Sequence, residues 1–68
     1  MIIKWTNKFS GESGYVKSIS VKGKHFNNTY NKDEARVFTS KGLLTAALNQ
    51  LKSFGETQNN DFTVETLG

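Results

Sequence analysis

The sequence predicts a small α+β domain in which a mainly antiparallel sheet is packed on one face by a single helix in the C-terminal half of the chain. Two patterns predict this class. Apolar and polar residues alternate in residues 1–6, 15–21 and 25–30, and again in residues 62–66, as they do in half-buried strands. Residues 41–54 instead carry apolar side chains three and four positions apart, which is typical of one face of a helix. A helix laid on one face of a sheet buries both apolar surfaces, so the expected element order is β-β-β-β-α-β.

Chain length and composition limit the molecule to one domain, residues 1–68. The chain has no cysteine and no cluster of metal ligands, so neither disulfides nor a structural metal can hold the fold together. The core must therefore be built from five Phe, two Tyr and one Trp, together with the aliphatic residues. Burying each such side chain gains about 1.5–3 kcal/mol, which predicts a folded but marginally stable domain.

The first predicted strand is residues 1–6, in which Ile3 and Trp5 share the inner face. Residues 7–13 are polar and include a glycine, so they predict a loop or a wide turn. Phe9 is the apolar exception in this loop and could fold back over the core.

The second predicted strand is residues 15–21. Ile19 and Val21 indicate that the odd-numbered positions face the core, with Lys17 at the margin extending its amine into water. Val16 would then lie on the solvent side of the sheet.

A tight turn at residues 22–24 leads to a third predicted strand, residues 25–30. Gly23 is expected to take the positive φ of this turn, because glycine alone does so without strain. Phe26 and Tyr30 share one face of the strand, although its two asparagines disfavour strand structure.

Residues 31–34 predict a turn, or a single turn of helix, capped by the side chain of Asn31 or Asp33. A brief fourth strand is expected at residues 35–39. Its buried apolar members are Val37 and Phe38.

The helix is expected over residues 41–54, with Ser40 as its N-cap and Gly55 as a left-handed C-cap. Gly42 in the first turn costs about 1 kcal/mol relative to alanine, which indicates close packing or a frayed start. The apolar face of the helix comprises Leu44, Ala47, Leu48, Leu51 and Phe54. A polar loop at residues 56–60 leads to a last strand whose inner face carries Phe62, Val64 and Thr66.

The segment 31–51, with the glycine-tyrosine-valine-lysine sequence at 14–17, resembles small uncharacterised proteins encoded by phages and prophages of Gram-positive bacteria. The shared pattern is an acidic turn, an alanine-arginine-valine-phenylalanine-threonine stretch, an amphipathic helix and a final valine-glutamate strand. The residues that match it are Asp33, Ala35, Arg36, Val37, Phe38, Thr39, Val64 and Glu65. The resemblance covers most of the chain and implies a phage or prophage origin. It implies no activity.

No group of residues has the composition of a catalytic or metal site. His25 is the sole histidine, whereas a metal site needs three or four converging ligands. Asp33 and Glu34 are adjacent carboxylates in a turn, where such residues usually serve as helix-start charges. The serines lack a nucleophile elbow, and the glycines form no phosphate loop. We therefore expect no enzyme activity, no cofactor, no metal and no small-molecule substrate.

Charge is unevenly distributed along the chain. Residues 1–24 contain five lysines and one glutamate, whereas residues 43–68 contain one lysine and three acids. The basic half could attract a polyanion. Lysines that alternate with apolar residues are also typical of a solvated sheet face or a protected edge strand, and we favour that interpretation.

We favour a protein-interaction module of unknown specific function, which binds a protein partner or associates with itself, for example as a homodimer. Aromatic side chains that do not fit inside a small core would mark the interface. The interaction candidates are Trp5, Phe9 and Tyr30.

The alternative is a nucleic-acid-binding domain that uses a basic sheet face. A three-stranded sheet followed by a helix is similar to the N-terminal DNA-binding domain of some phage-type integrases, which lay the sheet in the major groove. The resemblance implies contacts to phosphates and base edges by Lys4, Lys17, Lys22, Lys24, Tyr15, Asn27 and Asn28. Against it, the chain has one arginine, and arginine makes the commonest specific contact to guanine.

Residues 1–5 lack the apolar segment of a signal peptide, and no run approaches the ~20 apolar residues of a membrane span. We expect a cytoplasmic protein that does not enter a membrane.

Overall fold

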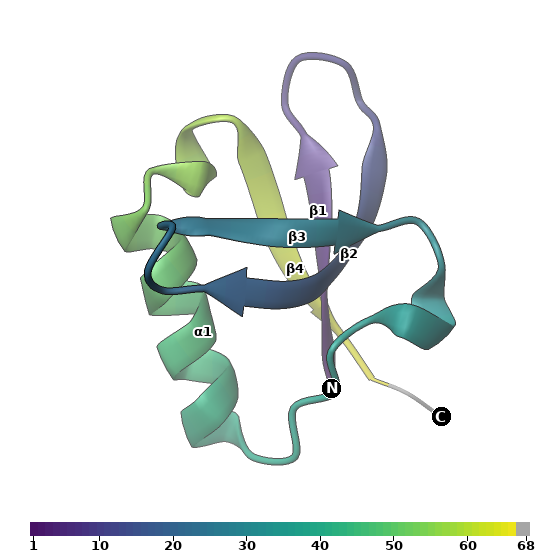
Figure 1. Cartoon of the computed structure of the whole chain (residues 1–68). Helices are drawn as coiled ribbons and strands as arrows, with labels where there is room; N and C mark the ends of the chain where they lie inside the picture. The colour runs from purple at the N-terminus through teal and green to yellow at the C-terminus, as the bar shows by residue number, and fades with distance from the viewer. Residues whose placement is uncertain (67–68) are drawn as a thin grey trace.

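The computed structural model describes residues 1–66 and contains an antiparallel sheet with one α-helix (Figure 1). The strands are β1 (Ile2–Asn7), β2 (Ser13–Ser20), β3 (His25–Thr29) and β4 (Asn60–Glu65). The helix α1 (Lys41–Ser53) lies between β3 and β4 in the chain, flanked by the short 3-10 helices η1 (Lys32–Glu34) and η2 (Glu56–Gln58). The sheet order is β3-β2-β1-β4, and every neighbouring pair is antiparallel. The predicted α+β class, with one helix packed on an antiparallel sheet, is confirmed.

The predicted strand at residues 35–39 is wrong, because this extended segment forms no ladder with a neighbouring strand. Its backbone hydrogen bonds go to two different places. The Arg36 N–H donates to the Val16 carbonyl over 2.9 Å, while Phe38 exchanges two hydrogen bonds with Met1. Phe38 is buried as predicted, but Val37 is 54% exposed. The sheet therefore has four strands instead of the five of the expected order β-β-β-β-α-β.

A bulge in β2 decides which of its side chains enter the core. Val16 pairs with Asn28 and Ser18 with Asn27, so Lys17 has no partner on β3. One extra residue reverses the alternation, and Val16 and Ile19 consequently share the inner face. Val16 is fully buried and Val21 is 61% exposed, so the predicted inner face of residues 15–21 is wrong except at Ile19.

The sheet curls strongly enough to bring its two outer strands together. The rings of Phe26 on β3 and Phe62 on β4 are 5.6 Å apart, although β2 and β1 separate these strands in the sheet. In a flat sheet the two strands would be about 14 Å apart, at three inter-strand spacings. Figure 1 shows β3 and the second half of β2 crossing over β1 and β4.

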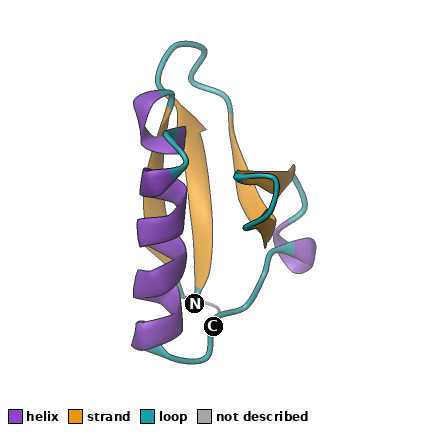
Figure 2. Ribbon diagram, turned by 60° about the vertical axis from the view of Figure 1, so that its left-hand side comes forward, coloured by secondary structure: helices purple, strands orange, loops and turns teal. Residues whose placement is uncertain are grey.

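The core lies within this curl and is closed by the helix. Figure 2 shows α1 running alongside β1 and β4. The buried cluster comprises Ile3, Trp5, Val16, Phe38, Leu44, Ala47 and Leu51. Three of these residues, Leu44, Ala47 and Leu51, lie on α1 and belong to the apolar face that the sequence spacing predicts.

Both helix caps are confirmed. The Ser40 hydroxyl accepts a hydrogen bond from the Leu43 N–H over 3.2 Å, and Gly55 takes a left-handed φ of 82°. Gly42 is exposed, with nothing within 4 Å of the position that a Cβ would occupy, so close packing is not the reason for this glycine. No helix in residues 1–66 is long and apolar enough to cross a membrane.

Two turns are also defined. The Asn31 side chain accepts a hydrogen bond from the Asp33 N–H over 2.9 Å, which confirms one of the two caps predicted for this turn. In the β2–β3 turn the positive φ belongs to Lys24, at 55°, so the prediction for Gly23 is wrong.

Candidate functional site

A cavity of about 310 Å³ opens beside β3. Its wall combines two aromatic rings, three amides and two carboxylates, and no lysine or arginine contributes to it. The lining residues are Trp5, Asn7, Glu12, Phe26, Asn28, Glu56 and Asn60. They come from β1, the β1–β2 loop, β3, η2 and β4, so the curl of the sheet assembles the cavity.

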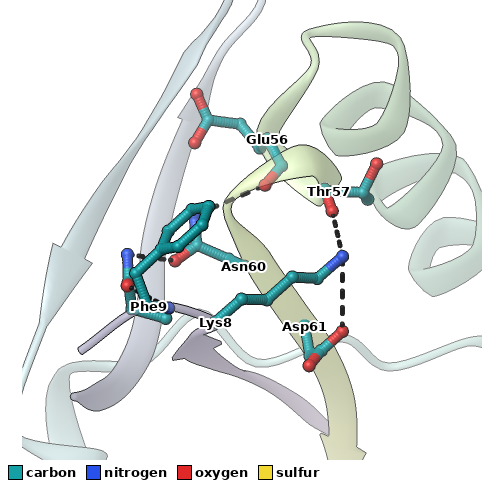
Figure 3. Close-up of polar contacts among 7 residues, drawn as sticks. Lys8, Phe9, Glu56, Thr57, Asn60 and Asp61 are labelled. Carbon is teal, nitrogen blue, oxygen red and sulfur yellow. Dashed lines mark hydrogen bonds and ion pairs between the residues drawn. The ribbon is translucent and has the colours of Figure 1, made fainter. Parts of the chain in front are cut away.

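Hydrogen bonds hold two of the amides in place. The Asn7 Oδ1 accepts from the backbone N–H groups of Phe9 and Ser10, each over 2.9 Å. The Asn60 Nδ2 donates to the Glu56 carbonyl over 3.4 Å (Figure 3). The Asn7 Nδ2 also donates to the Asn60 Oδ1 over 3.5 Å, at the register position where β1 and β4 pair these two residues.

Lys8 lies next to this wall, but its amine contacts groups that do not line the cavity. Its Nζ donates to the Thr57 carbonyl over 2.8 Å and lies 3.8 Å from the Asp61 carboxylate. Figure 3 shows the Glu56 carboxylate turned away from Lys8. Within residues 1–66, the carboxylates of Glu56 and Glu12 have no ion-pair partner. The cavity therefore keeps two uncompensated negative charges in a chain of net charge +3.

Tyr30 contacts two of the lining residues, Glu12 and Trp5, without lining the cavity itself. Its hydroxyl donates to the Glu12 Oε1 over 2.6 Å, and its ring meets Trp5 edge-on with centroids 6.0 Å apart. The hydrogen bond to Glu12 is the main cause that raises the pKa of Tyr30, because it binds the protonated phenol; partial desolvation and the charge of Glu12 act in the same direction.

Trp5 forms the buried part of the wall. It is 6% exposed, and its indole N–H is buried without a hydrogen-bond partner in the described part of the chain. Its ring lies over Gly14, its cross-strand partner on β2. An unsatisfied buried donor costs about 1–3 kcal/mol, so such a group calls for an explanation.

The predicted interaction candidates differ widely in exposure. Tyr30 is 63% exposed and contacts Trp5, while Trp5 is 6% exposed and contributes to the cavity wall. Phe9 is 81% exposed in the β1–β2 loop, so the prediction that it covers the core is wrong.

The predicted nucleic-acid residues are divided between the two faces of the sheet. Register places Lys4, Tyr15 and Asn27 on the face turned away from the core, whereas Asn28 lines the cavity. Lys17 sits at the bulge, and Lys22 and Lys24 lie in the β2–β3 turn.

The outer face of the sheet is also partly occupied. The carboxylate of Glu34 accepts from the Thr29 hydroxyl over 2.8 Å, and Lys32 pairs with Glu65 over 3.4 Å. Thr29 and Glu65 both lie on the outer face, so η1 spans from β3 to β4 there. Ile2, on the same face, is fully buried.

Sequence reasoning missed five cavity residues, namely Asn7, Glu12, Phe26, Glu56 and Asn60. Asn7 and Asn60 are 53 residues apart, and no local pattern relates them. Residues 1–66 contain no group of three or more His, Cys, Asp or Glu that could hold a metal ion.

Comparison of the chain with protein-family models, with curated proteins and with solved structures found no match.

The pKa of Tyr30 gives a direct test of its hydrogen bond to Glu12. We expect Tyr30 to titrate above its ordinary value of about 10, as followed by absorbance near 295 nm. The folded state favours the protonated phenol, so this contribution to stability is complete below the ordinary pKa and is lost as pH rises through the raised one. Glu12→Ala should return the pKa toward its ordinary value, and Tyr30→Phe should remove the step. An unchanged titration in Glu12→Ala would show that Glu12 does not cause the shift.

Proposed function

We propose that this protein is a non-enzymatic interaction module that binds an extended segment of a partner protein along the free edge of β3. The observation that supports the proposal is the character of this edge. β3 has a sheet neighbour, β2, on one side only (Figure 1), and its residues 25–29 include no Asp, Glu, Lys or Arg. An uncharged edge strand presents unpaired backbone groups that pair readily with another chain.

The opposite edge of the sheet is protected. β4 carries Asp61 and Glu65, and each of these is paired with a lysine. Charged side chains on an edge strand hinder the addition of another strand. The charged β4 edge is therefore protected, and the uncharged β3 edge is not.

The cavity lies where an added strand would use it. Phe26 and Asn28 project from the inner face of β3 into the cavity wall. Alternate side chains of a strand laid along β3 would point to that same face. Backbone pairing supplies affinity in such complexes, and a pocket for one side chain supplies specificity.

A displayed library of random ten-residue peptides tests the proposal. We expect selected peptides to slow amide hydrogen exchange in β3 while leaving β4 unchanged. Asn27→Lys should weaken binding at least tenfold by placing a charge on the β3 edge, and the matched Thr63→Lys on β4 should not. Protection confined to β4 or α1, or a library without any binder, would contradict the proposal.

A second candidate, nucleic-acid binding, is favoured by one observation: Lys4, Tyr15 and Asn27 share the outer face. Asp61 and Glu65 lie on that face as well, and they oppose a polyanion. Fluorescence anisotropy on random duplex DNA at 50 and 200 mM salt decides this case. Phosphate contacts are strongest at low salt, so an absence of binding at 50 mM removes the candidate.

A phage or prophage origin and a cytoplasmic location stay predictions that accompany this proposal. A second copy of this chain is the other candidate occupant of the β3 edge. Light scattering over a concentration series would detect it, and a dimer abolished by Asn27→Lys would identify a second copy as the partner.

A further inference from the structure

We infer that the cavity beside β3 is a recognition pocket for the basic side chain of a lysine or arginine in the bound segment. The inference rests on the proposed function for the source of that side chain. The choice of a basic side chain rests on the residues that line the cavity.

Charge selects the class of ligand. Glu12 and Glu56 line the cavity, no basic residue lines it, and neither carboxylate is paired with a cation within residues 1–66. Glu56 is half-buried, so solvent screens its charge less than that of a fully exposed carboxylate. One ammonium or guanidinium group would be attracted by both carboxylates and would neutralise one of the two charges, whereas an anion would be repelled.

The remaining wall suits a cation on an aliphatic stem. The faces of aromatic rings attract cations, tryptophan most strongly, and Trp5 and Phe26 both line the cavity. The Asn7 Oδ1 already accepts two hydrogen bonds and the Asn60 Oδ1 one, so Asn28 is the lining asparagine whose amide oxygen is most available to a donor of lysine or arginine. The volume of about 310 Å³ is at the lower limit of small-molecule pockets and has room for one long side chain.

Capped single residues test the pocket without requiring strand addition. The probes are N-acetyl-arginine-methylamide and N-acetyl-lysine-methylamide, with the norleucine analogue as an uncharged isostere and glucose as a neutral polyol. Chemical shifts of the asparagine side-chain amides report binding at 50 and 300 mM NaCl. We expect saturable shifts with both basic probes and at least tenfold weaker binding at the higher salt.

Isosteric variants locate the charge. Glu56→Gln and Glu12→Gln keep the volume of each side chain, and each should weaken binding of the basic probes at least fivefold. The control is Asp61→Asn, because Asp61 is paired with Lys8 and does not line the cavity. Its binding should match that of the unmodified protein.

The outcomes separate this inference from the proposed function. Library peptides that protect β3, together with basic probes that do not bind, would overturn the pocket and leave the proposed function standing. Basic probes that bind, with no peptide protecting β3, would overturn strand addition and leave the pocket. Binding of norleucine or glucose as strong as that of arginine would overturn the assignment of a basic side chain.

Discussion

Replacing Leu51 with alanine is expected to lower the free energy of unfolding by about 2–5 kcal/mol. Leu51 is fully buried on the inner face of α1, in the cluster that also contains Ile3 and Trp5. The substitution removes apolar contact and leaves a cavity that the surrounding side chains fill only in part. A domain of 68 residues has a total stability of roughly 3–10 kcal/mol, so this variant should be largely unfolded at modest urea concentrations.

Urea denaturation followed by Trp5 fluorescence and by circular dichroism measures this loss. The matched control is Leu43→Ala, which makes the same change on the same helix at a side chain that is 54% exposed. We expect the control to change stability by less than about 0.5 kcal/mol. Equal losses in the two variants would show that α1 does not bury the face described above.

Gly14→Ala is expected to destabilise the protein by about 1–3 kcal/mol through overpacking. A Cβ at this position would lie 2.8 Å from the Trp5 Cζ2 and 2.9 Å from the Thr29 carbonyl oxygen. Neither neighbour can move freely, because the indole is buried and the carbonyl belongs to the backbone of β3. The displaced ring should also disturb the cavity wall, so the Trp5 emission spectrum should change along with stability.

The matched control for Gly14→Ala should change stability in the opposite direction. Gly42→Ala places a methyl group where nothing lies within 4 Å, inside a helix. Alanine is favoured over glycine in helices by about 0.5–1 kcal/mol, so this variant should gain stability. The denaturation curves of the two alanine variants should therefore move in opposite directions. A stabilised Gly14→Ala would show that the ring and the carbonyl are not as close as described.

The helix was predictable because its signals are local. The Ser40 hydroxyl caps the backbone N–H three residues later, and the left-handed φ of Gly55 ends the helix. The buried positions Leu44, Ala47 and Leu51 follow the helical repeat. Each of these signals operates within about one turn of helix and survives in the linear sequence.

The candidate site was not predictable in the same way. The aromatic character of Tyr30 makes it an interaction candidate, but its hydrogen bond to Glu12 follows from no local pattern. Glu12 and Glu56 were unremarkable loop residues until the fold placed both in one wall. Their meaning depends on which charges lie nearby, and residues far along the chain decide that.

The sequence by itself determined the α+β class, the bounds and caps of α1, the inner face of β1 and the turn capped by Asn31, since hydrogen bonds and side-chain periods within a few residues specify these features. Only the tertiary structure decided the bulge at Lys17, which turns Val16 inward, and the curl that brings Phe26 to Phe62. Strand register is set by contacts between distant segments, and an extra residue in one strand reverses every later face. The cavity follows from the curl, so it too exists only in the folded chain.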